Sequence, residues 1–304
     1  MNAPRDNPFD PNLGGNICGR VLSRGLSGIP GVEVLCPEAN AFTYTDSAGN
    51  FSLFGLPEDS LWIFFDHDSF VSDSVRVSLR KGRIDSITIH LNGKPYLINC
   101  KITTHHYERN WPPDPLYFCQ LSAIARDLDG EFDIDSVWFT IPEISLTRRL
   151  SYSPSEQNFN YTLFADELPG ENLEVLVGKD VFFMISDKEN AVSSSGPYHV
   201  GRIIYRSPCV IFPAGGQDTI KSETSFVWHR FDQGFYVRYH GEIVRIIGGG
   251  PGEIAHTFDL SGQNDTTYRL GSSLLDPGEY YWTLEVIDNL GNSCRSKEEK
   301  FYKD

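Results

Sequence analysis

The chain has 304 residues, of which 40% are apolar and 13% aromatic, so it can fill the cores of two or three domains and is too apolar for a disordered protein. Its formal net charge of −15 argues against a nucleic-acid partner and against an anionic membrane surface, because both require clustered Lys and Arg. No run of about 18 apolar residues predicts a transmembrane segment, and no signal-peptide hydrophobic region follows Met1.

The first 14 residues differ from the rest of the chain. They are polar, rich in proline and without hydrophobic periodicity, which predicts a flexible tether over residues 1–14. The Asn-Pro-Phe-Asp-Pro stretch at residues 7–11 resembles the segment after the lipidated cysteine of many bacterial lipoproteins. That resemblance implies an outer-membrane lipoprotein whose lipid anchor precedes Asn2 in the full-length precursor.

Residues 15–93 alternate apolar and polar side chains between turns rich in Gly, Pro and Ser, which predicts short half-buried strands. The motifs of this block are Gly19-x-Val21, Gly31-Val32-x-Val34, Thr45-Asp46-x-x-Gly49-x-Phe51, Leu56-Pro57 and an aromatic segment from Trp62 to Phe70. With these motifs the block resembles the carboxypeptidase regulatory-like domain. The resemblance implies a transthyretin-like β sandwich that serves as a non-catalytic folding or spacing module.

Residues 94–205 form a second block of strands without a long helical period. Strand-like runs lie at Tyr96–Thr103, Leu116–Ala125, Ser136–Ile141, Phe159–Leu163 and Val181–Ser186. A strand that ends in the Asp-rich turn at residues 127–130 restarts as Val137-x-Phe139, and Phe183-x-Ile185-x-Asp187 fits a late strand and its turn. In these features the block resembles bacterial immunoglobulin-like domains, which implies a second β sandwich.

Residues 206–304 carry the third pattern. Phe226-Val227-Trp228 suits a strand with a core tryptophan, and Leu275-x-Pro277-Gly278-x-Tyr280 begins a strand that places Tyr280 at a tyrosine-corner position. The block resembles a fibronectin type III-like domain. The sequence therefore predicts an all-β chain of three tandem antiparallel β-sandwich domains, at residues 15–93, 94–205 and 206–304.

The six cysteines fall into three pairs, one in each block. The first two pairs each bracket a turn, and the third would join the entry strand of its block to the exit strand. Cross-strand neighbours approach the Cα separation that a disulfide needs, about 4.4–6.8 Å. The sequence therefore predicts three disulfides and an oxidising compartment, hence an exported protein. The predicted bonds are Cys18–Cys36, Cys100–Cys119 and Cys209–Cys294.

One group of residues has the density of a site. Asp127, Asp129, Asp133 and Asp135 flank a glycine turn, and carboxylate oxygens on such a loop suit the 6–8 oxygen ligands that calcium takes, at about 2.3–2.6 Å. The spacing departs from an EF-hand loop, and Asp and Gly also dominate ordinary β turns. The two readings, a calcium site and a plain turn, remain open at this point.

No catalytic set emerges from the sequence. Asp66-His67-Asp68 and His105-His106 are neighbours on strands, so their side chains alternate between faces, and neither group has a third ligand at metal spacing. The glycines at 248–252 lack a following Lys-Ser/Thr, and no Gly-x-Ser-x-Gly elbow occurs. We therefore expect a non-enzymatic protein whose one candidate cofactor is calcium.

The aromatic residues offer a different kind of site. Trp62 and Phe64, and Trp111 in a proline-rich turn, could present flat rings to sugars, although tryptophan in a strand more often fills a core.

The predicted function is an extracellular or cell-surface spacer, adhesion or protein-interaction scaffold, with a protein or glycan as partner. The alternative is a glycan-binding accessory protein of a surface polysaccharide-handling system.

Overall fold

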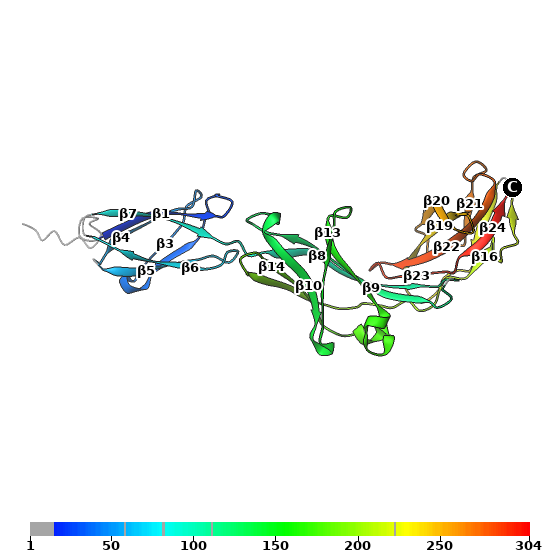
Figure 1. Cartoon of the computed structure of the whole chain (residues 1–304), viewed down its shortest axis with the longest axis horizontal. Coiled ribbons are helices and arrows are strands. Elements are labelled where there is room, and N and C mark those ends of the chain that lie inside the picture. The colour runs from blue at the N-terminus through cyan, green and yellow to red at the C-terminus, as the bar shows by residue number, and fades with distance from the viewer. Residues whose placement is uncertain (1–14, 58, 81–82, 111, 222) are drawn as a thin grey trace, which may run out of the picture.

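A computed structural model describes residues 15–304 except 58, 81–82, 111 and 222. Within this part the chain is all-β, and its helices are 3₁₀ turns of three or four residues. None of these helices is long and apolar enough to cross a membrane. Three β sandwiches follow one another along the long axis of the molecule (Figure 1). The predicted tether, residues 1–14, lies outside the described residues.

The first module has two facing sheets, with strand orders β4-β1-β7 and β3-β2-β5-β6. Along β5, Leu61, Ile63 and Phe65 are buried whereas Trp62 and Phe64 are exposed, the alternation that the sequence predicts. The elements are β1 (Gly15–Ser23), β2 (Glu33–Cys36), η1 (Pro37–Ala39), β3 (Ala41–Tyr44), β4 (Asn50–Leu56), β5 (Ser60–Asp66), β6 (Asp73–Ser78) and β7 (Ile84–Leu91).

The second module pairs a sheet of order β11-β10-β14-β15 with one that runs β12-β13-β9-β8. Its strands are β8 (Tyr96–Tyr107), β9 (Leu116–Arg126), β10 (Ile134–Ile141), β11 (Leu146–Arg149), β12 (Ser151–Ser153), β13 (Asn158–Phe164), β14 (Val181–Asp187) and β15 (Val192–Tyr198). Its 3₁₀ turns are η2 (Glu131–Asp133), η3 (Pro142–Ile144), η4 (Ala165–Glu167), η5 (Pro169–Glu171) and η6 (Leu173–Leu176).

The third module pairs the sheet β16-β18-β21 with a larger one in which β22 contacts β19, β23 and β24. Its strands are β16 (Val210–Phe212), β17 (Thr219–Ile220), β18 (Thr224–Trp228), β19 (Val237–Ile247), β20 (Gly250–Leu260), β21 (Thr267–Leu270), β22 (Gly278–Asp288), β23 (Ser293–Arg295) and β24 (Glu299–Lys303).

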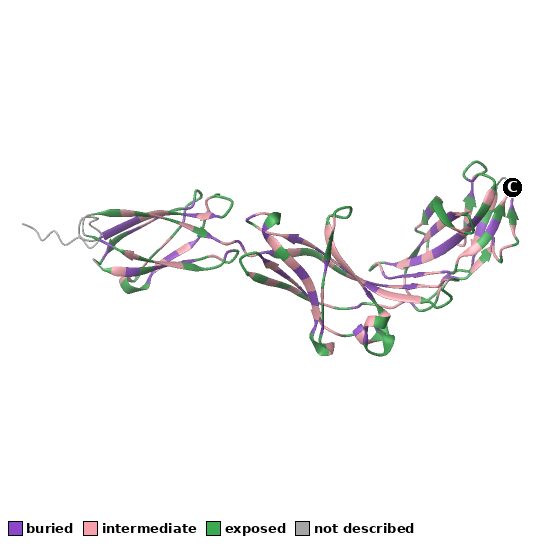
Figure 2. Cartoon of the chain, viewed as in Figure 1, coloured by how far each residue is buried: buried purple, intermediate pink, exposed green. Residues whose placement is uncertain are grey.

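Each module encloses its own hydrophobic cluster, seen as the purple bands inside the sandwiches in Figure 2. In the third module Trp228 and Trp282 are fully buried, and the Trp282 indole donates a hydrogen bond to the Pro213 carbonyl at 2.7 Å. The Tyr280 hydroxyl donates to the Asp276 carbonyl at 2.9 Å, which is the bond that a tyrosine corner makes. The predicted tyrosine corner is thereby confirmed.

The sequence predicts antiparallel pairing throughout, but some strand pairs are parallel. Among the described residues, β1–β7, β17–β24 and β8–β23 are parallel pairs. The last of these joins two modules, because β8 is the edge strand of the second module and β23 belongs to the third. Their register sets His105 opposite Ser293 and His106 opposite Cys294. One sheet of ten strands therefore runs through both modules.

The three predicted disulfides are absent, and all six cysteines are free thiols. Cys18 and Cys36 lie in opposite sheets of the first module, because β1 and β2 do not pair. Cys36 belongs to the core, whereas the Cys18 thiol lies beside the Ser52 hydroxyl at 3.3 Å on the neighbouring strand. The two strands therefore do not form the hairpin on which the predicted bond depended.

The other two pairs fail for different reasons. A bulge at residues 99–100 interrupts the β8–β9 register, and the residue opposite Cys119 is Thr104 rather than Cys100. In the third module Cys209 is exposed, whereas Cys294 is buried with its thiol 3.2 Å from the His106 Nδ1 atom. The argument for an oxidising compartment, which rested on paired cysteines, loses its support.

We expect Cys209 to react first with Ellman's reagent in the native protein, because its side chain is exposed. Cys119 and Cys294 should react only after unfolding, since burial raises the pKa of both thiols, that of Cys119 to about 12. The measurement is thiol titration with and without denaturant, with Cys209→Ser as the control that removes the fast phase. A peptide linking Cys18 to Cys36 in a non-reduced digest would contradict the structure.

Candidate metal centre between the first two modules

Three segments meet where the first module ends and the second begins. They are the linker Asn92–Lys94 after β7, the turn from Asp127 through η2 after β9, and the turn after β14 that starts at Asp187. The linker is held to the first module, because the Val71 amide donates to the Asn92 carbonyl and Phe70 forms a bridge with Gly93. It also contacts the second module, since the Asn92 amide donates to Asp187, 95 positions away in the chain.

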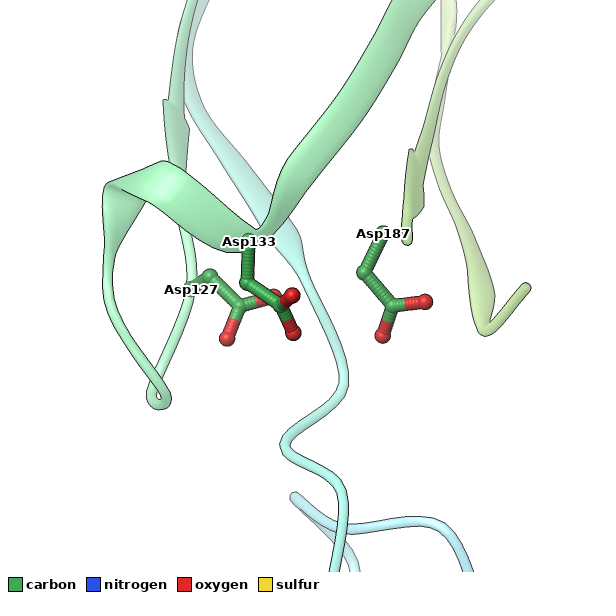
Figure 3. Close-up of side chains that lie close together, drawn as sticks. All are labelled: Asp127, Asp133 and Asp187. Carbon is green, nitrogen blue, oxygen red and sulfur yellow. The ribbon is translucent and has the colours of Figure 1, made fainter. Parts of the chain in front are cut away.

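Asp127, Asp133 and Asp187 converge at this junction (Figure 3). Each offers one carboxylate oxygen, and these oxygens all lie within 4.8 Å of one another. The Asp133 residue is 7% exposed and Asp187 is 2% exposed, so two of the three are withdrawn from water. The cluster is the one group of at least three such ligands within the part of the chain that the structure describes.

Local turn chemistry positions two of the three carboxylates. Asp127 Oδ1 accepts the Asp129 amide hydrogen at 2.7 Å, and Gly130, with φ of 116°, reverses the chain before η2. Asp187 Oδ1 accepts the amide hydrogens of Glu189 and Ala191 at 2.9 and 2.8 Å. One oxygen of each carboxylate thus closes a turn; the other oxygen of Asp127 is unpaired, and that of Asp187 accepts a hydrogen bond from the Asn92 amide.

Several oxygens at the junction are buried without a hydrogen-bond partner. They are Asp127 Oδ2, Asp133 Oδ2 and Asn92 Oδ1. The Asn92 amide is attached to the cluster, because its Nδ2 atom donates to Asp187 Oδ2 at 2.6 Å. Leaving a buried polar group unpaired costs about 1–3 kcal/mol, so three of them in one place is a large local cost.

The electrostatic environment is equally unfavourable. Burial raises the pKa of Asp127, and the negative charges of Asp129, Asp133 and Asp187 raise it further. Burial and the charge of Asp187 raise the pKa of Asp133. The charge of Arg24 lowers the pKa of Asp133 in turn, but the Arg24 Nη1 atom lies 2.7 Å from a carboxylate oxygen of Glu189, whose charge raises that pKa. The cluster therefore carries more negative charge than its protein neighbours neutralise.

Two of the four aspartates singled out by sequence lie outside this cluster. Asp129 accepts the Arg24 amide hydrogen at 2.8 Å and the Gly93 amide hydrogen at 2.6 Å, so it ties the second module to two segments of the first. Asp135 is exposed. Asp187 and Asn92, by contrast, were missed, because only the β10–β14 register, which sets Ile134 opposite Asp187, and the linker path bring them to the turn.

The donor set consists of hard oxygens, three carboxylates and one amide, without a histidine or cysteine. Such sets suit calcium, whereas zinc and copper favour nitrogen and sulfur ligands. The chemistry is one of binding, because nothing in the cluster is placed as a nucleophile with an adjacent base.

The aromatic candidates lie elsewhere. Trp62 and Phe64 are 42% and 43% exposed on the outer face of β5, and Phe42 and Tyr44 on β3 extend the same sheet face. The Trp62 and Phe64 rings are 6.4 Å apart and tilted by 36°. Trp62 therefore does not fill the core, whereas Trp111 lies outside the described residues.

Comparison with known proteins gives no family for this chain. No protein-family model matches it, and no curated protein matches its sequence. Among solved structures, the chicken CNTN1 FN1–FN3 domains align over 95% of this chain and 98% of theirs, at 10% identity and a TM-score of 0.34. Fibronectin(III)-like modules of Clostridium thermocellum CbhA cover 69% of this chain and 92% of theirs, at 9% identity and a TM-score of 0.32.

A DUF3823 family protein from Bacteroides ovatus aligns over 62% of this chain and 98% of its own, at 8% identity and a TM-score of 0.28. Scores at this level assign no function, and the fold class follows from the strands and sheets described above.

Replacing Asp129 with alanine should loosen the junction, because the Arg24 and Gly93 amides lose their acceptor. Each lost bond is worth about 1–3 kcal/mol, so hydrogen exchange at these two amides should accelerate roughly tenfold or more. Exchange measured by mass spectrometry on peptides covering residues 22–27 and 91–95 reports this directly. Asp135→Ala, an exposed aspartate of the same segment, should leave the exchange unchanged; equal effects of both substitutions would refute the assigned role.

Proposed function

We propose that this chain is a non-enzymatic cell-surface protein that acts as a spacer and interaction scaffold. The observation that carries the proposal is the end-to-end order of three sandwiches in which β8 belongs to the sheets of two modules (Figure 1). A strand shared by two modules restricts hinge motion between them, which is a property of a spacer and not of a flexible linker.

Side-chain contacts at the same boundary support stiffness. Asn292 Oδ1 accepts the amide hydrogen of Thr104 at 2.9 Å, and the Thr104 hydroxyl donates to the Arg202 carbonyl at 2.5 Å. The Arg202 guanidinium pairs with the fully buried Asp288 carboxylate at 2.8 Å. The Asn292–Thr104 and Arg202–Asp288 contacts cross the boundary, so opening it would expose these polar groups at once.

The finer assignments rest on the sequence motifs. We propose that the three modules, over residues 15–93, 94–205 and 206–304, are carboxypeptidase regulatory-like, immunoglobulin-like and fibronectin type III-like. We also propose that a lipid at the end of the tether holds the protein at the outer membrane. The motif at residues 7–11 supports that anchor, and the acidic surface is compatible with exposure to solvent.

Small-angle scattering tests the spacer. A compact globule of this length would have a radius of gyration of roughly 19 Å. We expect a value well above that and a distance distribution with an extended tail, because the modules lie in a row. A radius of gyration at the compact value would refute the proposal.

A second candidate function, glycan binding, is favoured by the exposed rings of Phe42, Tyr44, Trp62 and Phe64 on one sheet face, since flat rings can stack on pyranose faces. If it holds, a glycan array should show saturable binding that falls at least tenfold in Trp62→Ala. Phe54→Ala removes a comparably exposed ring of β4, in the other sheet, and is the matched control. Absence of saturable binding in the unmodified protein would exclude this candidate and leave the scaffold.

A further inference from the structure

We propose that Asp127, Asp133, Asp187 and Asn92 bind a calcium ion that fixes the first module onto the second (Figure 3). The proposal adds a ligand and a mechanical role to the scaffold and stands independently of what the scaffold binds. It also resolves the two readings of the Asp-rich segment: only Asp127 and Asp133 of that segment take part.

The first argument is the set of unpaired oxygens. Asp133 is more than nine-tenths buried, its Oδ2 atom has no hydrogen-bond donor, and its carboxylate lies beside those of Asp127 and Asp187 (Figure 3). The amide oxygen of Asn92 is also buried and unpaired, although its side chain carries no charge. The Asn92 side chain contacts the cluster through its Nδ2 atom, which donates to Asp187 Oδ2, and its own unpaired oxygen is available as a fourth ligand for a cation bound by the carboxylates.

The second argument is the missing counter-charge. Two basic side chains near the cluster are already engaged: Arg24 pairs with Glu189, and the Lys188 ammonium donates to the Phe132 carbonyl. Three carboxylate oxygens within 4.8 Å of one another repel, and burial strengthens the repulsion because water screens it less. A divalent cation would turn this repulsion into attraction.

The third argument selects calcium among divalent cations. Calcium accepts 6–8 oxygens at about 2.3–2.6 Å in irregular geometry and takes amide oxygens together with carboxylates. Magnesium requires near-octahedral geometry at about 2.0–2.1 Å and retains several waters, which a site enclosed by two turns and a linker accommodates poorly. The absence of nitrogen and sulfur ligands from the cluster disfavours zinc.

The position of Asn92 gives the ion its role. Asn92 belongs to the linker that follows β7, whereas the three aspartates belong to turns of the second module. An ion that binds all four therefore ties the linker to the second module, beside the Arg24 and Gly93 amides that Asp129 already holds. The angle between the first two modules becomes dependent on calcium, whereas the boundary at β8 and β23 is held by backbone pairing and by the side-chain contacts of Asn292 and Arg202.

The test compares the 304-residue chain with Asp133→Asn and Asp135→Asn. The Asp133→Asn change is isosteric, and no hydrogen bond to the Asp133 carboxylate would be lost, so the fold should be retained. Titration calorimetry with calcium chloride should give one site with a Kd below about 1 mM in the unmodified chain. The Kd should rise at least tenfold in Asp133→Asn and stay unchanged in Asp135→Asn.

In thermal unfolding, Asp133→Asn should change the Tm differently in chelator and in calcium. In a chelator, Asp133→Asn should melt at or above the temperature of the unmodified chain, because it removes one of three mutually repelling charges. With calcium at about ten times the Kd, the unmodified chain should gain several degrees in Tm and Asp133→Asn should gain none. Absence of calcium binding, equal binding by Asp133→Asn, or equal affinity for magnesium would each overturn the proposal.

The mechanical role has its own readout. Small-angle scattering of the unmodified chain should show a narrower distance distribution in calcium than in chelator, and Asn92→Ala should lose most of that difference while retaining measurable binding. If calcium binds but the two scattering curves coincide, the ion stabilises only the turn. That result would refute the proposal that calcium fixes the first module onto the second. That outcome leaves the proposed spacer function testable by the radius of gyration alone.

Discussion

The arrangement of the molecule depends most on the backbone pairing of β8. Ten of its 12 residues pair antiparallel with β9 along one edge, and the last three pair parallel with β23 along the other. An edge strand presents unpaired amide and carbonyl groups that must be covered. Here the covering strand comes from the next module, so satisfying one set of hydrogen bonds also fixes where the third sandwich lies.

Fold class was predictable because period-two alternation reports burial directly. In β22 the buried positions include Tyr280, Trp282, Leu284 and Val286, the face that alternation assigns. Which strands pair with each other was harder to predict from the sequence. Cys18 and Cys36 lie on consecutive strands, yet these strands enter different sheets, and alternation carries no information about which sheet a strand joins.

The same limit explains the candidate metal centre. Asp127 and Asp133 share one turn, so their proximity could be anticipated from composition and glycine placement. Asp187 and Asn92 reach the turn only through the β10–β14 register and the path of a short linker, both of which are long-range consequences of folding. Asp135 lies outside the cluster for a local reason, since it lies at the start of a strand on the side exposed to water.

The shared sheet also has a consequence for biosynthesis. The residues that join β8 to β23 are 188 positions apart in the chain, and β23 lies close to the C-terminus. At about 5–20 residues per second, the second module waits roughly ten to forty seconds on the ribosome before the strand that covers its edge is made. Until β23 is made, the edge of β8 at His105 and His106 has no partner and can pair with another strand.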